Sequence, residues 1–254
     1  MSILTLILIL ILSIFVVLSF HELGHLIAGL IQGFRFELFV VGPLGIKREN
    51  NKIKIYVNTN PSYYWGVTAT MPNDGHPVNA QKFARVLLAG PMASLFLAMI
   101  GLLAFSFVSK PFDLIFFSLG ALSLTTFFVT TLPSKAGMFF TDRKRYQRLV
   151  RPGKDQEVEL ALFRILGKYS KDESYKNLDI KDIKILIQED STFFHYYGLF
   201  CMKAYLIENE KDISAEFEQQ YSGASKMISK RMLVIFDNEL RKLNKDCAAN
   251  VNGK

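Results

Sequence analysis

Three residues near the amino terminus have the types and spacing to bind a metal. His21, Glu22 and His25 form an H-E-x-x-H pattern within residues 19–30, SFHELGHLIAGL. Residues four apart lie on one face of a helix, so both imidazoles can bind a single ion, and Glu22 is close enough to hold a water on it. Two imidazoles and a carboxylate ligand leave one position for water, which is the layout of a catalytic zinc site.

The sequence before this pattern favours a metal site over chance. An H-E-x-x-H pattern also arises by accident on helices of soluble proteins. Here it follows directly on an apolar run, residues 3–20, that contains no charged side chain. Ionisable groups within a membrane helix are costly and are usually functional. We therefore predict a metal site on a membrane-spanning helix.

Two histidines need a third protein ligand, and the residues alone leave its identity open. The acidic candidates near the apolar segments are Glu37, Glu49, Asp74, Asp113 and Asp142. Asp74 and His76, in NDGHP, are explained as turn residues. Asp113 is expected on the opposite membrane face, about 30 Å from the histidines. Asp142 follows the third apolar run on the histidine side, where it can also cap or begin a helix.

Composition predicts a membrane half followed by a polar half. The chain has 254 residues, 50% of them hydrophobic, and three apolar runs precede residue 133. We expect spanning helices at about 3–31, 83–108 and 112–132. The predicted fold is mainly α: a polytopic membrane protein with about three spanning helices, a small membrane-surface β-hairpin or sheet, and a soluble α-helical tail. The predicted domains are residues 1–150 and 151–254.

Net charge and cysteine content indicate the compartment of the protein and the molecules it contacts. The net charge of +7 fits cytoplasmic loops and anionic lipid rather than nucleic acid. Cys201 and Cys247 both lie in the polar half and imply no disulfide framework, which suits a reducing compartment. The first apolar run lacks a basic segment before it and a small-residue cleavage site before the histidines. We therefore expect a retained span rather than a signal peptide.

Basic residues orient the predicted spans. Seven of them follow Pro133 closely: Lys135, Arg143, Lys144, Arg145, Arg148, Arg151 and Lys154. The positive-inside rule makes this side cytoplasmic. Three spans then place the amino terminus and Lys110 outside, the histidines toward the cytoplasmic face, and the tail in the cytoplasm.

Residues 34–72 predict β structure beside the first span. Residues 36–41 and 52–57 are rich in β-branched and aromatic side chains, and 52–57 alternates. Gly42, Pro43 and Gly45 break the first stretch, and residues 49–51 make a turn. A β-hairpin or short sheet at the membrane surface and an ordinary cytoplasmic loop both stay open.

The second span carries AGPMAS at residues 89–94. Pro91 is expected to kink the helix. Gly90 and Ser94, four residues apart, form a small face that allows close helix contact. Helix packing alone and a direct role in the active site are both open for these residues.

The polar half is predicted to be helical. Val158, Leu162, Ile165 and Leu166 fit one helical face. Residues 180–187, 193–207 and 213–243 suggest three more helices, with a turn at 208–211 between the last two. His195 has no nearby partners for a metal, so we expect a packed or surface histidine rather than a ligand.

The first 150 residues resemble the site-2 protease family of intramembrane zinc metalloproteases. HELGH in the first span, Ala89-Gly90-Pro91 in the second and an aspartate after the third occur in the order typical of that family. The resemblance implies that His21, His25 and Asp142 bind one catalytic Zn²⁺ and that Glu22 activates water. It also implies cleavage of a peptide bond in or near a transmembrane segment of a membrane-protein substrate.

Three positions depart from the family pattern. Family members usually have a glycine after the aspartate, an asparagine shortly before the post-span proline and often an asparagine after Gly-Pro, where this chain has Arg143, Thr130 and Ser94. The alternative function is a catalytically inactive member that acts as a membrane binding or regulatory protein. Arg143 favours this alternative, and the intact H-E-x-x-H pattern opposes it.

A metal transporter is the third function considered, but one paired-histidine site without further intramembrane acids makes a poor ion path. We expect a multi-pass protein of a bacterial cell membrane that contacts the lipid bilayer and binds no nucleic acid. Its partners are a membrane-protein or membrane-peptide substrate and, for the tail, a cytoplasmic protein.

Overall fold

The computed structural model describes residues 2–49, 51–136 and 139–252. Within these residues, three helices are long and apolar enough to cross a membrane: α1 (Ile3–Ile31), α2 (Val78–Phe105) and α3 (Asp113–Thr131). A four-stranded antiparallel sheet follows α1, and shorter or more polar helices follow α3. The predicted fold class, mainly α with three spanning helices and a small sheet, is confirmed.

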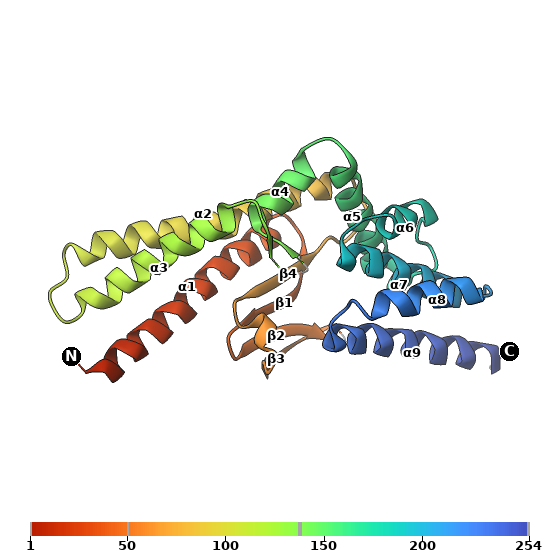
Figure 1. Cartoon of the computed structure of the whole chain (residues 1–254), viewed down its shortest axis with the longest axis horizontal. Coiled ribbons are helices and arrows are strands. Elements are labelled where there is room, and N and C mark those ends of the chain that lie inside the picture. The colour runs from red at the N-terminus through yellow and green to blue at the C-terminus, as the bar shows by residue number, and fades with distance from the viewer. Residues whose placement is uncertain (1, 50, 137–138, 253–254) are drawn as a thin grey trace. The chain divides into compact units, whose positions relative to one another are not determined.

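The chain forms two compact units. The first comprises Met1–Met71, Ala80–Ala136 and Phe140–Val150, and the second comprises Pro72–Asn79, Gly137–Phe139 and Arg151–Lys254. The sheet and nearly all of the three long helices belong to the first unit (Figure 1). The loop before α2 belongs to the second unit, although it lies between two segments of the first in sequence.

Small residues let the three long helices approach closely. A Cβ atom on Gly24 of α1 would lie 2.7 Å from the Ala89 carbonyl oxygen of α2, and one on Gly101 of α2 would lie 2.7 Å from the Gly120 nitrogen of α3. Close backbone approach of this kind is typical of membrane helices, whose association depends on van der Waals packing. Gly24 lies between the two histidines, so this contact places the H-E-x-x-H turn against α2.

The ends of α2 differ from the prediction. The helix begins at Val78, directly after Pro77, rather than at residue 83, and it ends at Phe105 rather than 108. Proline leaves the residue after it free to begin a helix, and the polar segment 78–82 continues the helical hydrogen bonding. At the other end, Pro111 disfavours helix for the residue before it, and the chain has already turned by then.

The sheet has the strand order β3-β2-β1-β4, and all neighbouring strands are antiparallel. Its strands are β1 (Arg35–Val41), β2 (Leu44–Glu49), β3 (Lys52–Val57) and β4 (Val67–Met71). The predicted break at Gly45 is wrong, because Gly45 lies inside β2 opposite Tyr56. The Tyr56 ring occupies the space where a Cβ atom would stand, so glycine suits this strand position.

One face of the sheet is turned toward α1. The Thr68 hydroxyl of β4 donates a hydrogen bond to the Glu22 carbonyl oxygen at 3.2 Å, and Thr70 touches Gly29. Phe39 is the cross-strand partner of Thr68 and is buried on the same face. The sheet therefore holds β4 alongside the turn of α1 that carries the H-E-x-x-H pattern.

The second unit is a set of helices with an aromatic core. They are α5 (Lys154–Asp172), α6 (Ile180–Ile187), α7 (Thr192–Glu208), α8 (Ala215–Ser225) and α9 (Lys230–Asn252). The single helix predicted over 213–243 is wrong, because residues 226–229 separate α8 from α9 and the Ser229 hydroxyl accepts a hydrogen bond from the Met232 amide. His195 is packed, and its Nδ1–H donates to the Ile187 carbonyl oxygen.

Candidate metal centre

Three side chains from distant parts of the sequence converge in the first unit. His21 and His25 lie on successive turns of α1, and Asp142 is the first residue of α4 (Asp142–Val150). The Asp142 Oδ2 atom lies 3.3 Å from Nε2 of His21 and 3.4 Å from Nε2 of His25. One donor atom from each of the three residues falls within a group spanning at most 4.8 Å.

This spacing suits zinc. Zinc bonds to imidazole nitrogen and carboxylate oxygen are about 2.0–2.2 Å long and tetrahedrally arranged, which places neighbouring donor atoms about 3.3–3.5 Å apart. The two histidine–aspartate distances match that separation. Both histidines are buried, and 20% of the Asp142 side chain is exposed, so the group is open on one side only. A two-histidine, one-carboxylate set leaves the fourth position for water.

Hydrogen bonds from α2 aim both imidazoles at this point. The His25 Nδ1–H donates to the Val86 carbonyl oxygen at 2.8 Å, and His21 Nδ1 is 2.9 Å from the hydroxyl of the fully buried Ser94. A hydrogen bond at Nδ1 leaves the Nε2 lone pair available for a metal. Ser94 therefore has more than a packing role. The contribution of Val86 had no sequence signal, because it comes from a backbone oxygen.

The absence of a side chain at Gly90 leaves space for the His25 ring. A Cβ atom on Gly90 would collide with the His25 ring, including its Nε2 atom. Gly90 and Ser94 lie four residues apart on α2, so one face of that helix both admits one histidine and bonds the other. The sequence left open helix packing alone or a direct role in the active site, and the contacts of this face with both histidines favour the second.

Glu22 is buried on α1 beside a glycine of the sheet edge. Only 8% of the residue is exposed, and a Cβ atom on Gly66 would lie 2.6 Å from Glu22 Oε1. Gly66 precedes β4 and has a φ of +97°, a backbone conformation that favours glycine. No sequence pattern singles out Gly66, because its role depends on a carboxylate 44 residues away in the chain.

Asp142 is held by the turn that precedes it. The Thr141 hydroxyl donates to the Leu132 carbonyl oxygen at 2.8 Å and accepts from the Ser134 amide at 3.1 Å, which fastens the start of α4 to the end of α3. Burial alone raises the pKa of the Asp142 carboxyl, but the adjacent imidazoles of His21 and His25 lower it overall. The carboxylate is therefore ionised, as a metal ligand must be.

Arg143 turns away from this carboxylate. Its guanidinium lies 5.4 Å from the centre of the Tyr146 ring on the same helix. The residue is exposed, and its contact with Tyr146 is a cation–π interaction. The departure from the family glycine therefore leaves the three donor atoms undisturbed.

The other acidic candidates have different partners. Glu37 pairs with Arg35, and Glu49 pairs with Lys47 and Lys54. Asp74 accepts hydrogen bonds from the His76 amide and the Asn79 side chain, as a turn residue does.

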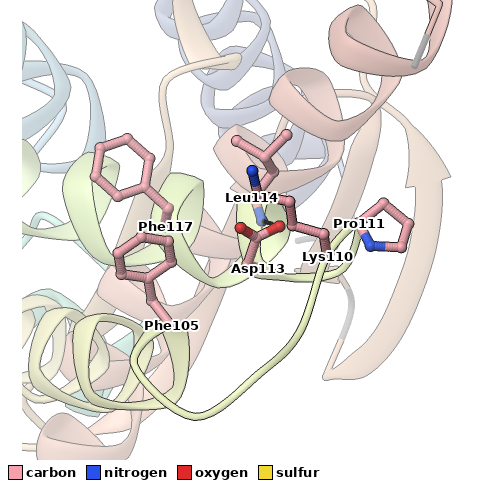
Figure 2. A pocket seen from close by; sticks show the side chains of 6 residues that line it. All are labelled: Phe105, Lys110, Pro111, Asp113, Leu114 and Phe117. Atoms are coloured by element: carbon pink, nitrogen blue, oxygen red, sulfur yellow. Dashed lines mark hydrogen bonds between the residues drawn. The ribbon is translucent and has the colours of Figure 1, made fainter.

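Asp113 lines a separate pocket of about 550 Å³ at the connection between α2 and α3. Figure 2 shows its carboxylate beside Lys110, with the rings of Phe105 and Phe117 to one side. Its Oδ1 atom accepts a hydrogen bond from the Leu114 amide at the start of α3. Asp113 therefore belongs to the end of the helical hairpin and not to the histidine cluster.

Comparison with known protein families supports the resemblance to the site-2 protease family. Residues 9–249 match the Peptidase family M50 profile, which covers both units and not only the membrane half. Searches of curated proteins and of solved structures returned no match. The chain belongs to Peptidase family M50, the site-2 protease family of membrane metalloproteases.

Proposed function

We propose that the protein is a zinc-dependent intramembrane endopeptidase that cleaves a peptide bond in or near a transmembrane segment. One observation carries the proposal: the donor atoms of His21, His25 and Asp142 meet beside Glu22, on a helix apolar enough to cross a membrane. Ionisable groups within a membrane helix are energetically costly, and those that occur there are usually functional.

Each residue has a role that its contacts support. His21, His25 and Asp142 would hold Zn²⁺, which when bound polarises a scissile carbonyl and lowers the pKa of water. Glu22 would accept a proton from the attacking water and deliver it to the leaving amine. The absence of a side chain at Gly66 lets the Glu22 carboxylate lie against the backbone just before β4.

Two of the three departures from the family pattern, Arg143 and Ser94, weigh little against activity. Arg143 was the feature that favoured an inactive relative, and its contact with Tyr146 leaves Asp142 free to face the histidines. Ser94 is hydrogen-bonded to His21 from the position where the family often has asparagine. Both observations support an active enzyme.

We further propose that the amino terminus and Lys110 lie outside the cell membrane and that the tail lies in the cytoplasm. The positive-inside rule supports this orientation. A single cysteine at position 110, in a chain whose own cysteines are replaced by serine, should react with a membrane-impermeant maleimide in intact cells. Reaction only after lysis would reverse the orientation.

The decisive test compares Glu22→Gln with the native chain. Purified protein is reconstituted with single-span membrane peptides, and metal content and cleavage are both measured. Glu22→Gln should retain zinc and lose cleavage by about 10²–10⁴-fold, the usual contribution of a general base. Glu37→Gln is the matched control, since Glu37 pairs with Arg35 away from the cluster, and it should cleave normally. Undiminished cleavage by Glu22→Gln would overturn the catalytic assignment.

A further inference from the structure

A second cavity in the first unit lies against α1 on the side of the sheet. It measures about 340 Å³, and its walls are apolar. Ile14, Phe15 and Leu18 of α1 form one side, and Val41, Pro43 and Trp65 are among the residues of the other. Its volume falls at the lower end of the range for ligand pockets, about 300–1,000 Å³. It has room for a few side chains but not for a whole helix.

The cavity is next to the proposed general base at two points. Leu18 lies one helical turn before Glu22 on α1, a separation of about 6 Å along the axis. Trp65 immediately precedes Gly66, whose missing side chain makes room for the Glu22 carboxylate. The Leu18 end of the cavity therefore lies about one helical turn from the residue that would act on the substrate, and the Ile11 and Ile14 end lies roughly two to three turns away.

The apolar residues that line the cavity favour an apolar side chain as its occupant. No charged side chain is among the lining residues, and most of the α1 side of the cavity comes from the uncharged part of a candidate span. A polar side chain placed there would lose its hydrogen bonds with water without replacement, which costs about 1–3 kcal/mol or more. A large apolar side chain would bury surface in contact with Phe15 and Trp65.

We propose that this cavity is a specificity pocket that receives a large apolar side chain of the substrate, such as Leu, Ile, Met or Phe, next to the scissile bond. The inference rests on the proposed endopeptidase function and adds its substrate preference. A peptide bond held in an extended backbone beside Glu22 presents its neighbouring side chains to either side of that backbone. The cavity beside Trp65 takes one of these side chains, and Ile14 and Phe15 limit its length.

The test is a change in preference, not a loss of activity. The full-length zinc-loaded chain is incubated in detergent with a pool of synthetic spanning peptides of varied sequence, and mass spectrometry maps the bonds cleaved. Bonds beside Leu, Ile, Met or Phe should be cleaved about tenfold or more over bonds beside Gly or Ser, since one or two methylene groups in an apolar pocket are worth about that factor.

Two variants should shift that preference in opposite directions. Ile14→Trp fills the cavity and should favour bonds beside Ala over Leu by about tenfold relative to the native chain, whereas Phe15→Ala enlarges it and should favour Phe and Trp. Leu12→Trp is the matched control, because Leu12 lies on the same helix, is 63% exposed and is not among the lining residues. Zinc content should be equal in all four proteins.

Two results would contradict the proposed specificity pocket without contradicting the proposed endopeptidase function. One is cleavage by the native chain without an apolar preference. The other is an equal change for all peptides in Ile14→Trp and Phe15→Ala, which would indicate that a lipid acyl chain fills the cavity. Absence of any cleavage by the native chain would instead count against the proposed function.

A binding measurement tests the proposed specificity pocket even if the native chain cleaves no peptide. Peptides carrying photoreactive leucine beside the preferred bond, or across the pool if no bond is cleaved, are crosslinked to the Glu22→Gln protein. Adducts should form on Phe15 or Trp65 and should fall about tenfold in Ile14→Trp but not in Leu12→Trp. Adducts spread equally over Leu12 and the lining residues would refute the proposal.

Discussion

Buried polar groups have different arrangements in the two units. In the second unit, two pairs satisfy each other: Arg164 donates to both carboxylate oxygens of the buried Asp182 at 2.6–3.0 Å, and the hydroxyls of Tyr196 and Tyr221 bond at 2.8 Å. In the first unit His21, His25 and Asp142 point their donor atoms at one common space. Burying polar atoms is costly in both places.

This difference distinguishes polar groups that stabilise the fold from polar groups that can bind a metal. A pair such as Arg164 and Asp182 balances its own charge, so it needs no further group. Two imidazole nitrogens and a carboxylate oxygen within 4.8 Å of one another can present lone pairs to the same point, which suits a bound cation. We therefore expect mutations in the first cluster to change metal binding and mutations in the second unit to change stability.

Loss of a metal ligand is the largest expected effect. Asp142→Ala should lower zinc affinity by more than the roughly 10–100-fold typical of an outer-shell change and should abolish cleavage. Asp74→Ala should do neither, because Asp74 bonds to His76 and Asn79 in a turn. Zinc titrations of both variants in detergent compare them directly. Metal loss in Asp74→Ala with normal binding in Asp142→Ala would reverse the ligand assignment.

Removal of the hydroxyl that positions His21 should have the next largest effect. Ser94→Ala removes the partner of His21 Nδ1 and should weaken zinc binding by about 10–100-fold. Ser123→Ala is the matched control, since this hydroxyl on α3 is buried without a hydrogen-bond partner among the described residues. Competition titration with a zinc-sensitive dye measures both. Equal effects of the two variants would show that Ser94 acts only through packing.

A broken ion pair in the second unit should affect stability alone. Arg164→Ala leaves the buried Asp182 carboxylate without its partner and should destabilise α5 and α6 by about 1–3 kcal/mol, less than a fully buried pair because 37% of the Arg164 side chain is exposed. Hydrogen exchange of amides in these helices measures the change. Zinc affinity should match that of the native chain, and a large loss of zinc would contradict the separation between the units.

The smallest expected effect concerns Cys201. Burial raises the pKa of its thiol to about 12, so only about one thiol in ten thousand is ionised at pH 8. In a Cys247→Ser background, native protein should therefore resist labelling by maleimide at pH 8, whereas protein unfolded in detergent should label fully. Rapid labelling of the native protein would mean that the core of the second unit opens readily.

The sequence predicted the local features of this protein reliably. The two histidines lie on successive turns of one helix, and the helical period alone brings His21 and His25 to one face. Length and hydropathy likewise predicted the three long helices, because a membrane span needs a long uncharged run. One error fell where a side chain from another strand decides the outcome, since Gly45 continues a strand and Tyr56 covers it. Another error was local: the Ser229 hydroxyl accepts from the Met232 amide and helps separate two helices that were expected as one.

Only the tertiary structure decided how the cluster is completed. From the residues alone, five acids were candidates for the third ligand, and the resemblance to a family implied Asp142. The fold brings Asp142 to the histidines because Thr141 fastens the start of α4 to the end of α3. The Val86 carbonyl and the space at Gly66 are properties of a backbone path and leave no trace in residue type. A helix pattern is encoded within a few neighbouring residues, but contacts between segments tens of residues apart depend on the packing of the whole unit.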